Sequence, residues 1–126
     1  MIDRMMRIQA DLEEQPHLHR LGALFSETVL IKVDGKEYYL VFSNGHIARV
    51  VEGPSKKTPY RFGFITDAAA LKEFWTLAPA PGFHDIFAMA KIGRAEIVGD
   101  MLLLVKNLRF FKEVLALPRT RQEGEA

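Results

Sequence analysis

The chain of 126 residues has no cysteine, a net charge of only +1 and no long apolar run. Without cysteine there is no disulfide framework, no thiolate nucleophile and no cysteine-based zinc site. So small a net charge gives no electric field that would favour nucleic acid or an anionic membrane as a partner. Uninterrupted apolar runs such as Met101 to Val105 are far shorter than the roughly 20 residues that span a bilayer. We therefore expect no nucleic-acid partner and at most transient contact with a membrane.

Sorting signals are scarce too. The N-terminal segment MIDRMMRIQADLEE lacks the apolar stretch of a signal peptide, and the C-terminal RQEGEA carries no obvious address signal. These features predict a cytoplasmic protein. A hydrophobic content of 48% is ordinary for a globular protein of this length. We expect one domain over residues 1–126, of which 118–126 form a polar tail.

The clearest local pattern lies between residues 25 and 52. Asp34-Gly35 and Asn44-Gly45 both favour positive φ angles at the two central positions of a type I′ hairpin turn. They predict a three-stranded meander with strands at about 25–33, 36–43 and 46–52. Two-residue turns would pair Val29 with Leu40, Ile31 with Tyr38, Lys32 with Glu37, Phe42 with Ile47, and Tyr38 with Val51.

Both faces of this meander are largely apolar, whereas a sheet with one wet face usually alternates cleanly. Either both faces are partly covered, or a partner subunit covers one. The predicted register also places Arg49 on the apolar face beside Ile47 and Val51. There its guanidinium would meet a lipid carboxylate or headgroup, or else reach water or pair with a protein carboxylate.

The remaining elements follow from periodicity and from helix-breaking residues. Helices are expected at about 2–15, 17–24, 67–77 and 83–91, strands at about 60–65 and 94–98, and a proline-rich linker at 78–82. One last, nearly all-apolar helix of about 17 residues should begin after Asp100 as its N-cap and end at Pro118. This order predicts an α+β domain with helices mainly on one side of a single sheet.

Catalytic signals are weak. His17 and His19 form an H-x-H pair near Glu13 and Glu14, which is either a metal-binding group or two solvated or partly buried histidines. His46 follows a hairpin turn and His84 lies near an expected helix start, where polar residues are common. The sequence contains no serine in a G-x-S-x-G setting and no glycine-rich phosphate loop. We expect no enzyme, metal or cofactor; the alternative is a small enzyme with His46 or His84 as base.

The apolar surface is large for so small a domain. It comes from the meander, two aromatic-bearing helices and the last helix, and it needs either a bound ligand or a protein partner to cover it. Residue patterns alone leave a ligand cavity and a dimer interface equally open.

The segment from Gly93 to Asp100, GRAEIVGD, followed by MLLLV, resembles the closing motif of the sterol carrier protein 2 family. In that family a strand of the form G-K-x-x-I-x-G-D leads into an apolar C-terminal helix. The resemblance covers about residues 5–117 and includes the order of helices and strands. It implies a five-stranded, mainly antiparallel sheet with helices on one face, enclosing an apolar tunnel for a sterol, fatty acid, acyl-CoA or phospholipid.

The resemblance implies lipid contacts but no catalytic residue. By position, the lipid-contacting side chains would be Leu40, Phe42, Arg49, Phe74, Trp75, Phe87, Met101, Leu104, Leu108 and Phe111. The leading hypothesis is therefore non-enzymatic binding or transfer of a lipid. The alternative is a dimerisation or accessory module that supports an enzyme of lipid or quinone metabolism, with a homodimer or that enzyme as partner. The insertion at 78–82 departs from the family pattern and would reshape the tunnel mouth.

Overall fold

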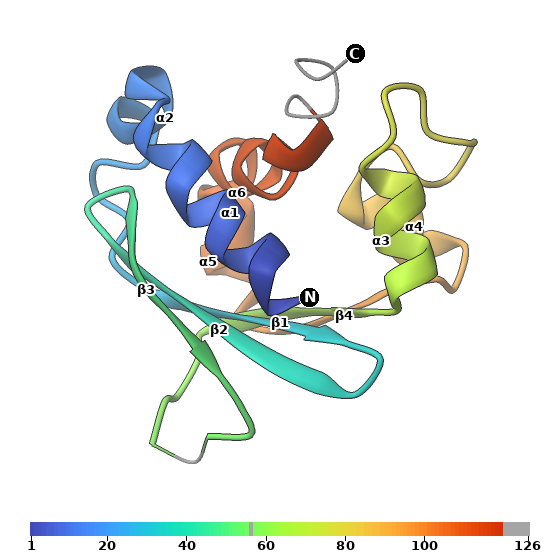
Figure 1. Ribbon diagram of the computed structural model, residues 1–126, viewed down its shortest axis with the longest axis horizontal. Coiled ribbons are helices and arrows are strands. Elements are labelled where there is room, and N and C mark those ends of the chain that lie inside the picture. Colours follow the sequence, from blue (N-terminus) through green and yellow to red (C-terminus); the bar gives the residue numbers. More distant parts are fainter. Residues whose placement is uncertain (56, 120–126) are drawn as a thin grey trace.

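The computed structural model describes residues 1–55 and 57–119, and so leaves most of the expected polar tail outside the described residues. Its elements are, in chain order, α1 (Ile2–Glu13), α2 (Pro16–Leu21), β1 (Thr28–Val33), β2 (Lys36–Ser43), β3 (His46–Glu52), β4 (Phe62–Thr66), α3 (Ala68–Phe74), α4 (Ile86–Lys91), β5 (Glu96–Gly99), α5 (Met101–Lys106) and α6 (Leu108–Leu115). The five strands form one sheet in the order β3-β2-β1-β4-β5. All neighbouring strands are antiparallel except β1 and β4. The helices lie on one face of this sheet (Figure 1), so the α+β prediction is confirmed.

The hairpin turns form as their dipeptides predict. Asp34 and Asn44 have φ angles of 52° and 49°, and each is followed by a glycine with a φ of 84°. Between β1 and β2 the predicted register is confirmed, because Val29 faces Leu40. The cross-strand ion pair also forms, with Lys32 Nζ 4.0 Å from Glu37 Oε2. Turn chemistry alone was sufficient to set this register.

The second hairpin contains a bulge that the sequence did not signal. Phe42 faces Ile47 as predicted, but the register then shifts, and Val41 faces Arg49. The predicted pairing of Tyr38 with Val51 is wrong, because Tyr38 faces Glu52 instead. Arg49 therefore leaves the apolar face, and its side chain is exposed. An extra residue in one strand moves every following side chain to the opposite face.

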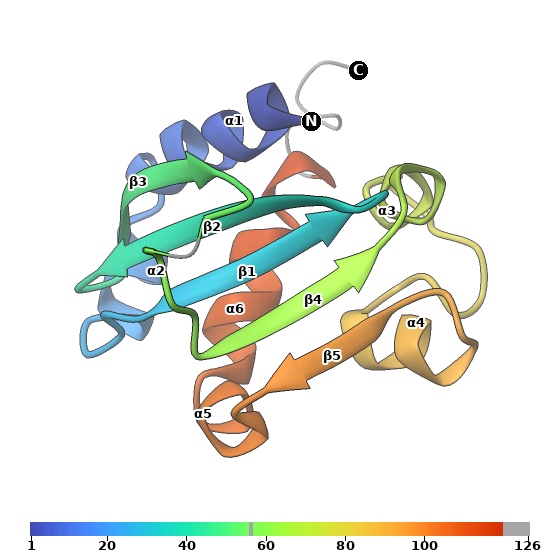
Figure 2. The same ribbon diagram turned by 90° about the horizontal axis from the view of Figure 1, so that it is seen from below.

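The face of the sheet opposite the helices is also partly covered. Leu30 and Tyr39 point to that side, yet they are only 4% and 3% exposed. The segment between β3 and β4 crosses below this face (Figures 1 and 2) and brings the Tyr60 ring to 6.4 Å from the Tyr39 ring. The chain thus covers part of both faces itself, which agrees with the first of the two alternatives that the sequence left open.

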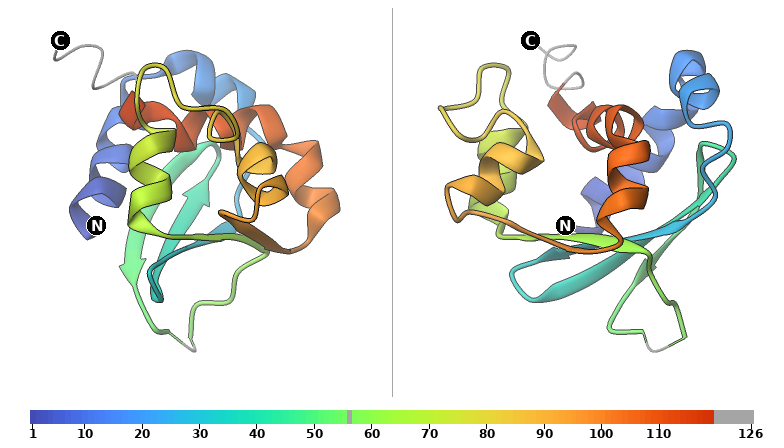
Figure 3. Two further views of the ribbon diagram at one scale, coloured as in Figure 1. Left: turned by 90° about the vertical axis from the view of Figure 1, so that its right-hand side faces the viewer. Right: turned by 180° about the vertical axis from the view of Figure 1, so that it is seen from behind.

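The apolar C-terminal stretch forms two helices, so the prediction of one continuous helix is wrong. Asp100 caps α5 as predicted, accepting a hydrogen bond from the Leu103 N–H at 3.0 Å. The break falls at Asn107, whose φ and ψ are −117° and 21°. Its side-chain amide donates to the Leu103 carbonyl at 3.0 Å. A side chain that bonds to the preceding turn competes with the helical backbone, and α6 then leaves at an angle to α5 (Figure 3).

Candidate functional site

The residues predicted to contact a lipid come from the sheet and from helices α3, α4, α5 and α6. Six of these ten residues belong to one buried core and are at most 3% exposed: Leu40, Phe42, Phe74, Trp75, Leu104 and Phe111. Phe87 and Leu108 are partly buried against the same core. Met101 is 43% exposed, and Arg49 points away from the core. Eight of the ten candidates therefore lie in or against one core, whereas Met101 and Arg49 do not.

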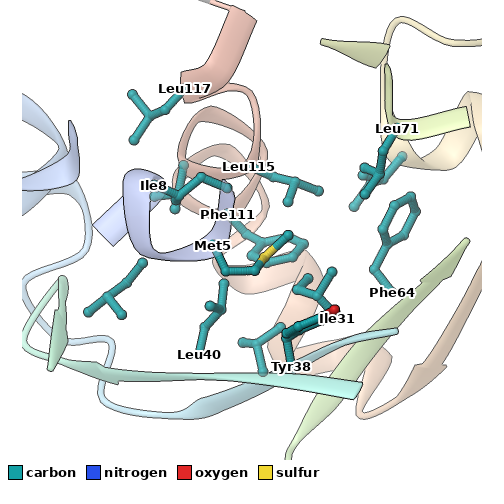
Figure 4. Packing of buried hydrophobic residues seen from close by; sticks show 14 of the residues in the cluster. Met5, Ile8, Ile31, Tyr38, Leu40, Phe64, Leu71, Phe111, Leu115 and Leu117 are labelled. Atoms are coloured by element: carbon teal, nitrogen blue, oxygen red, sulfur yellow. The ribbon is translucent and has the colours of Figure 1, made fainter. Parts of the chain in front are cut away.

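An aromatic cluster joins the sheet to α6. The Phe42 ring lies 5.7 Å from Phe110, and the Phe62 ring lies 5.2 Å from Phe111, both in edge-to-face geometry. Phe25 lies 5.1 Å from Phe42 and completes the cluster. Such pairs add to the stabilisation that burial gives. The sheet and α6 thus contact each other through these rings. Figure 4 shows Phe111 of α6 in the same buried cluster as Leu40 and Ile31 of the sheet. Space for a ligand at this point requires that side chains or a helix move.

Sequence reasoning missed Phe25, Phe62 and Phe110 as members of this region. Phe25 and Phe62 alternate with polar or small neighbours in predicted strands, which is the signal that could have placed them on the inner face. Phe110 gave no such signal, because the break before α6 resets the helical phase. Sequence periodicity finds an inward-facing residue only where the element that carries it is continuous.

Trp75 has a specific partner in this core. Its indole N–H donates to the carbonyl oxygen of Leu115 across 2.9 Å, and both groups are buried. The Arg4 guanidinium lies 5.7 Å from the centre of the Trp75 ring. These contacts attach the end of α3 to α6 and to α1, so Trp75 holds the helical layer together whether or not it also contacts a ligand.

The short helix α5 has one buried face and one exposed apolar face. Leu104 is completely buried, whereas Met101, Leu102 and Val105 are 43%, 65% and 54% exposed. Few apolar residues of one short helix are normally left in water together, and such a patch commonly marks a contact surface. Because the helix breaks at Asn107, this exposed surface belongs to α5 alone and does not continue along α6.

An ion-pair bridge attaches the start of α5 to the sheet. Arg61 donates to Asp100 Oδ2 at 3.0 Å and to Glu27 Oε1 at 3.2 Å. The Leu103 N–H and the Arg61 guanidinium hold the pKa of the Asp100 carboxyl below its usual value. The ionised carboxylate therefore caps α5 and pairs with Arg61 at neutral pH.

Two basic residues, Lys91 and Arg94, precede β5 and so lie at the end of that strand opposite to α5. Arg94 pairs with Asp67 at 3.2 Å and lies over the Phe83 ring, and Lys91 is exposed.

A surface hollow of about 200 Å³ lies beside α6. It is lined by Phe74, His84, Asp85, Ile86, Lys112, Glu113, Ala116 and Arg119. Burial opposes ionisation of Asp85, but the Ala88 N–H and Lys112 outweigh it and lower the pKa of this carboxyl. The hollow thus has paired charges of both signs.

Comparison with solved structures connects this geometry to a known fold. A sterol carrier protein 2 crystal structure superposes with a TM-score of 0.69, at 14% identity, covering 89% of this chain and 90% of its own. The ubiquinone synthesis protein UbiJ-SCP2 gives a TM-score of 0.61 at 18% identity, covering 91% and 87%. The chain has the sterol carrier protein 2 fold. A conserved Thermus thermophilus protein described as a candidate sterol carrier protein also shares this fold, at 13% identity with a TM-score of 0.62, covering 86% and 78%.

Sequence comparison adds nothing to this likeness. No family model matches the chain, and no curated protein matches it. At identities of 13–18% the sterol carrier protein 2 likeness shows the fold alone. No helix among the described residues is long and apolar enough to cross a bilayer.

Proposed function

We propose that the chain binds a lipid without catalysis, in a chamber that opens between the inner face of the sheet and helices α5 and α6. The apolar character of α5 carries this proposal, because the helix buries Leu104 completely in the core and exposes Met101, Leu102 and Val105 on its other side. The sterol carrier protein 2 fold supports it, since structural neighbours with this fold include sterol carrier proteins. The described core contains no buried charged side chain, which suits an acyl chain or a sterol ring system.

The chamber opens by displacement of α5. The break at Asn107 lets α5 move with little change in α6, and Gly99, with a φ of 94°, ends the strand on its other side. Burying a sixteen-carbon chain gains roughly 0.8 kcal/mol per methylene, about 12 kcal/mol in all. Association and ordering cost a similar amount. Affinity therefore depends on how easily α5 leaves the core.

The test is displacement of a fluorescent fatty acid and a fluorescent sterol from the purified chain. Leu104→Trp fills the chamber beneath α5 and should weaken probe binding at least about tenfold, with an overpacking cost of about 1–3 kcal/mol in stability. Met6→Trp is the matched control, because Met6 is 54% exposed on α1. It should bind the probe like the wild type.

Two outcomes would contradict the proposal. If Leu104→Trp folds and binds the probe as tightly as Met6→Trp, the last helices do not line the site. If neither probe binds the wild type saturably, the chain is not a lipid-binding protein of this kind.

A second candidate is an accessory module, in which a homodimer contact or an enzyme partner covers the face of α5. Its support is the structural likeness to a protein named for ubiquinone synthesis. Native mass spectrometry of protein purified gently from cells separates the two proposals. Bound lipid on a monomer favours the first, and a lipid-free dimer or an enzyme complex favours the second.

A further inference from the structure

Two histidines and a glutamate from separate elements meet beside the Asn44-Gly45 turn. Glu13 ends α1, His19 lies in α2, and His46 begins β3. One potential metal-ligand atom from each lies within 4.8 Å of the others. The cluster lies at the α2 end of the molecule (Figure 1), and the proposed lipid chamber makes no use of it.

A backbone carbonyl fixes the orientation of His19. Its Nε2 atom lies 2.7 Å from the carbonyl oxygen of Leu12. Because a carbonyl oxygen only accepts hydrogen bonds, Nε2 carries the ring proton and Nδ1 keeps its lone pair. Metal-binding histidines commonly donate their other ring N–H to such a carbonyl. His19 is thus already in the tautomer that binds a metal through Nδ1.

The distances within the cluster are close to those of a coordination site. His46 Nδ1 lies 3.0 Å from Glu13 Oε1. The rings of His19 and His46 are stacked, with their centroids 4.0 Å apart. Neighbouring ligand atoms of a tetrahedral zinc site are roughly 3.3 Å apart, given bonds of about 2.0–2.1 Å. Rotation of the His46 ring out of this stack would bring all three groups onto one ion. The proton that His46 Nδ1 shares with Glu13 would then move to Nε2 of the same ring, which leaves Nδ1 free to bind the metal.

Backbone packing holds the turn that carries His46 against the helix that carries His19. A Cβ atom on Gly45 would lie 2.9 Å from the Gly22 carbonyl oxygen and 3.1 Å from that of His19. The Gly45 N–H donates to the Phe25 carbonyl at 3.1 Å. The ligand-bearing elements thus meet through close backbone contact, which pre-organises the site.

We propose that Glu13, His19 and His46 form a binding site for a divalent transition metal, with Zn²⁺ as the type case. Two imidazoles and one carboxylate form a common three-ligand set for zinc, with the fourth position open to water. Imidazole nitrogens favour zinc, copper, nickel and cobalt over calcium and magnesium, which prefer oxygen ligands. The bound ion links the end of α1, α2 and the start of β3.

The experiment titrates the full chain, without a polyhistidine tag, with Zn²⁺ in competition with a chromophoric chelator. The wild type should bind one Zn²⁺ per chain. His19→Ala and His46→Ala should each weaken binding at least about tenfold, a loss typical of perturbed metal sites. His17→Ala is the matched control, because His17 lies in the same helix but faces Glu113, 3.4 Å away. It should bind Zn²⁺ like the wild type.

Further measurements keep the result decisive if an alanine variant folds poorly. Glu13→Gln keeps the side-chain volume and should also weaken Zn²⁺ binding, and Zn²⁺ should raise the thermal midpoint of the wild type. Co²⁺ should give the intense visible bands of a tetrahedral site in the wild type. The proposal is wrong if Co²⁺ gives only its weak aqueous spectrum. It is also wrong if Zn²⁺ binds the His19→Ala/His46→Ala double variant as tightly as the wild type, or if His17→Ala weakens Zn²⁺ binding as much as His46→Ala.

Discussion

Replacement of Gly99 by alanine should destabilise the chain through a backbone clash at the entrance to α5. Gly99 has a φ of 94°, a conformation that alanine adopts only under strain. A Cβ atom there would lie 2.5 Å from the Arg61 carbonyl oxygen and 2.7 Å from Phe62 Cα. Both of these are backbone atoms of the neighbouring strand, so no side-chain rotation relieves the contact.

The magnitude follows from two contributions. A left-handed backbone costs an alanine about 1–2 kcal/mol. Overpacking against a structure that cannot yield adds typically about 1–3 kcal/mol. Gly99→Ala should therefore lower the free energy of unfolding by about 2–5 kcal/mol.

Gly93→Ala separates the two contributions. Gly93 also has a positive φ, 77°, but a Cβ atom there would meet nothing within 4 Å. This variant should lose only the backbone contribution, about 1–2 kcal/mol. Urea unfolding, followed by the fluorescence of the single tryptophan and by far-UV circular dichroism, gives the free energy of unfolding of both variants. The comparison holds if the two variants have the same m-value. If Gly99→Ala is no less stable than Gly93→Ala, the close approach of Gly99 to the backbone of Arg61 and Phe62 does not constrain the chain.

Two further variants test the cap and the core. The Leu103 N–H and Arg61 lower the pKa of Asp100 in the folded chain. Its ionised form therefore stabilises the fold at pH values above the pKa that Asp100 has in the unfolded chain. This contribution is lost as the pH falls through the lowered pKa of the folded chain. Asp100→Asn, which can still cap a helix, should be less stable than the wild type at pH 7, and the gap in urea unfolding should close in strong acid. Trp75→Phe leaves the buried Leu115 carbonyl without its donor and should lose about 1–3 kcal/mol. Because it also removes the single tryptophan, its urea unfolding is followed by far-UV circular dichroism alone; a loss below about 0.5 kcal/mol would contradict that role.

Local chemistry explains which parts of the fold the sequence could predict. Asp34-Gly35 and Asn44-Gly45 determine their turns within four residues, so the β1–β2 register followed directly. The bulge that turns Arg49 outward depends on how β3 follows the twisted sheet, and no residue near it marks an extra position. Asn107 was compatible with a continuous helix by periodicity, and only its bond to Leu103 in the folded chain shows the break.

The candidate site was predictable to a similar extent. Burial of Leu104 and Phe111 followed from the apolar character of the C-terminal segment. The exposure of Met101 did not, because a short helix that meets the core through one face leaves its first residue free. The apolar tunnel stays a prediction, since the volume of a core depends on how side chains from several elements interlock.

The bulge in β3 also decides how the sheet can meet another molecule. β3 is one edge of the sheet, and the bulge bends it while Arg49 places a cation beside it. The other edge, β5, is only four residues long. Bulges, charges and short strands all hinder edge-to-edge pairing. The sheet therefore resists extension into a second chain at either edge, and self-association through another surface, such as the exposed apolar face of α5, is favoured over pairing of strands.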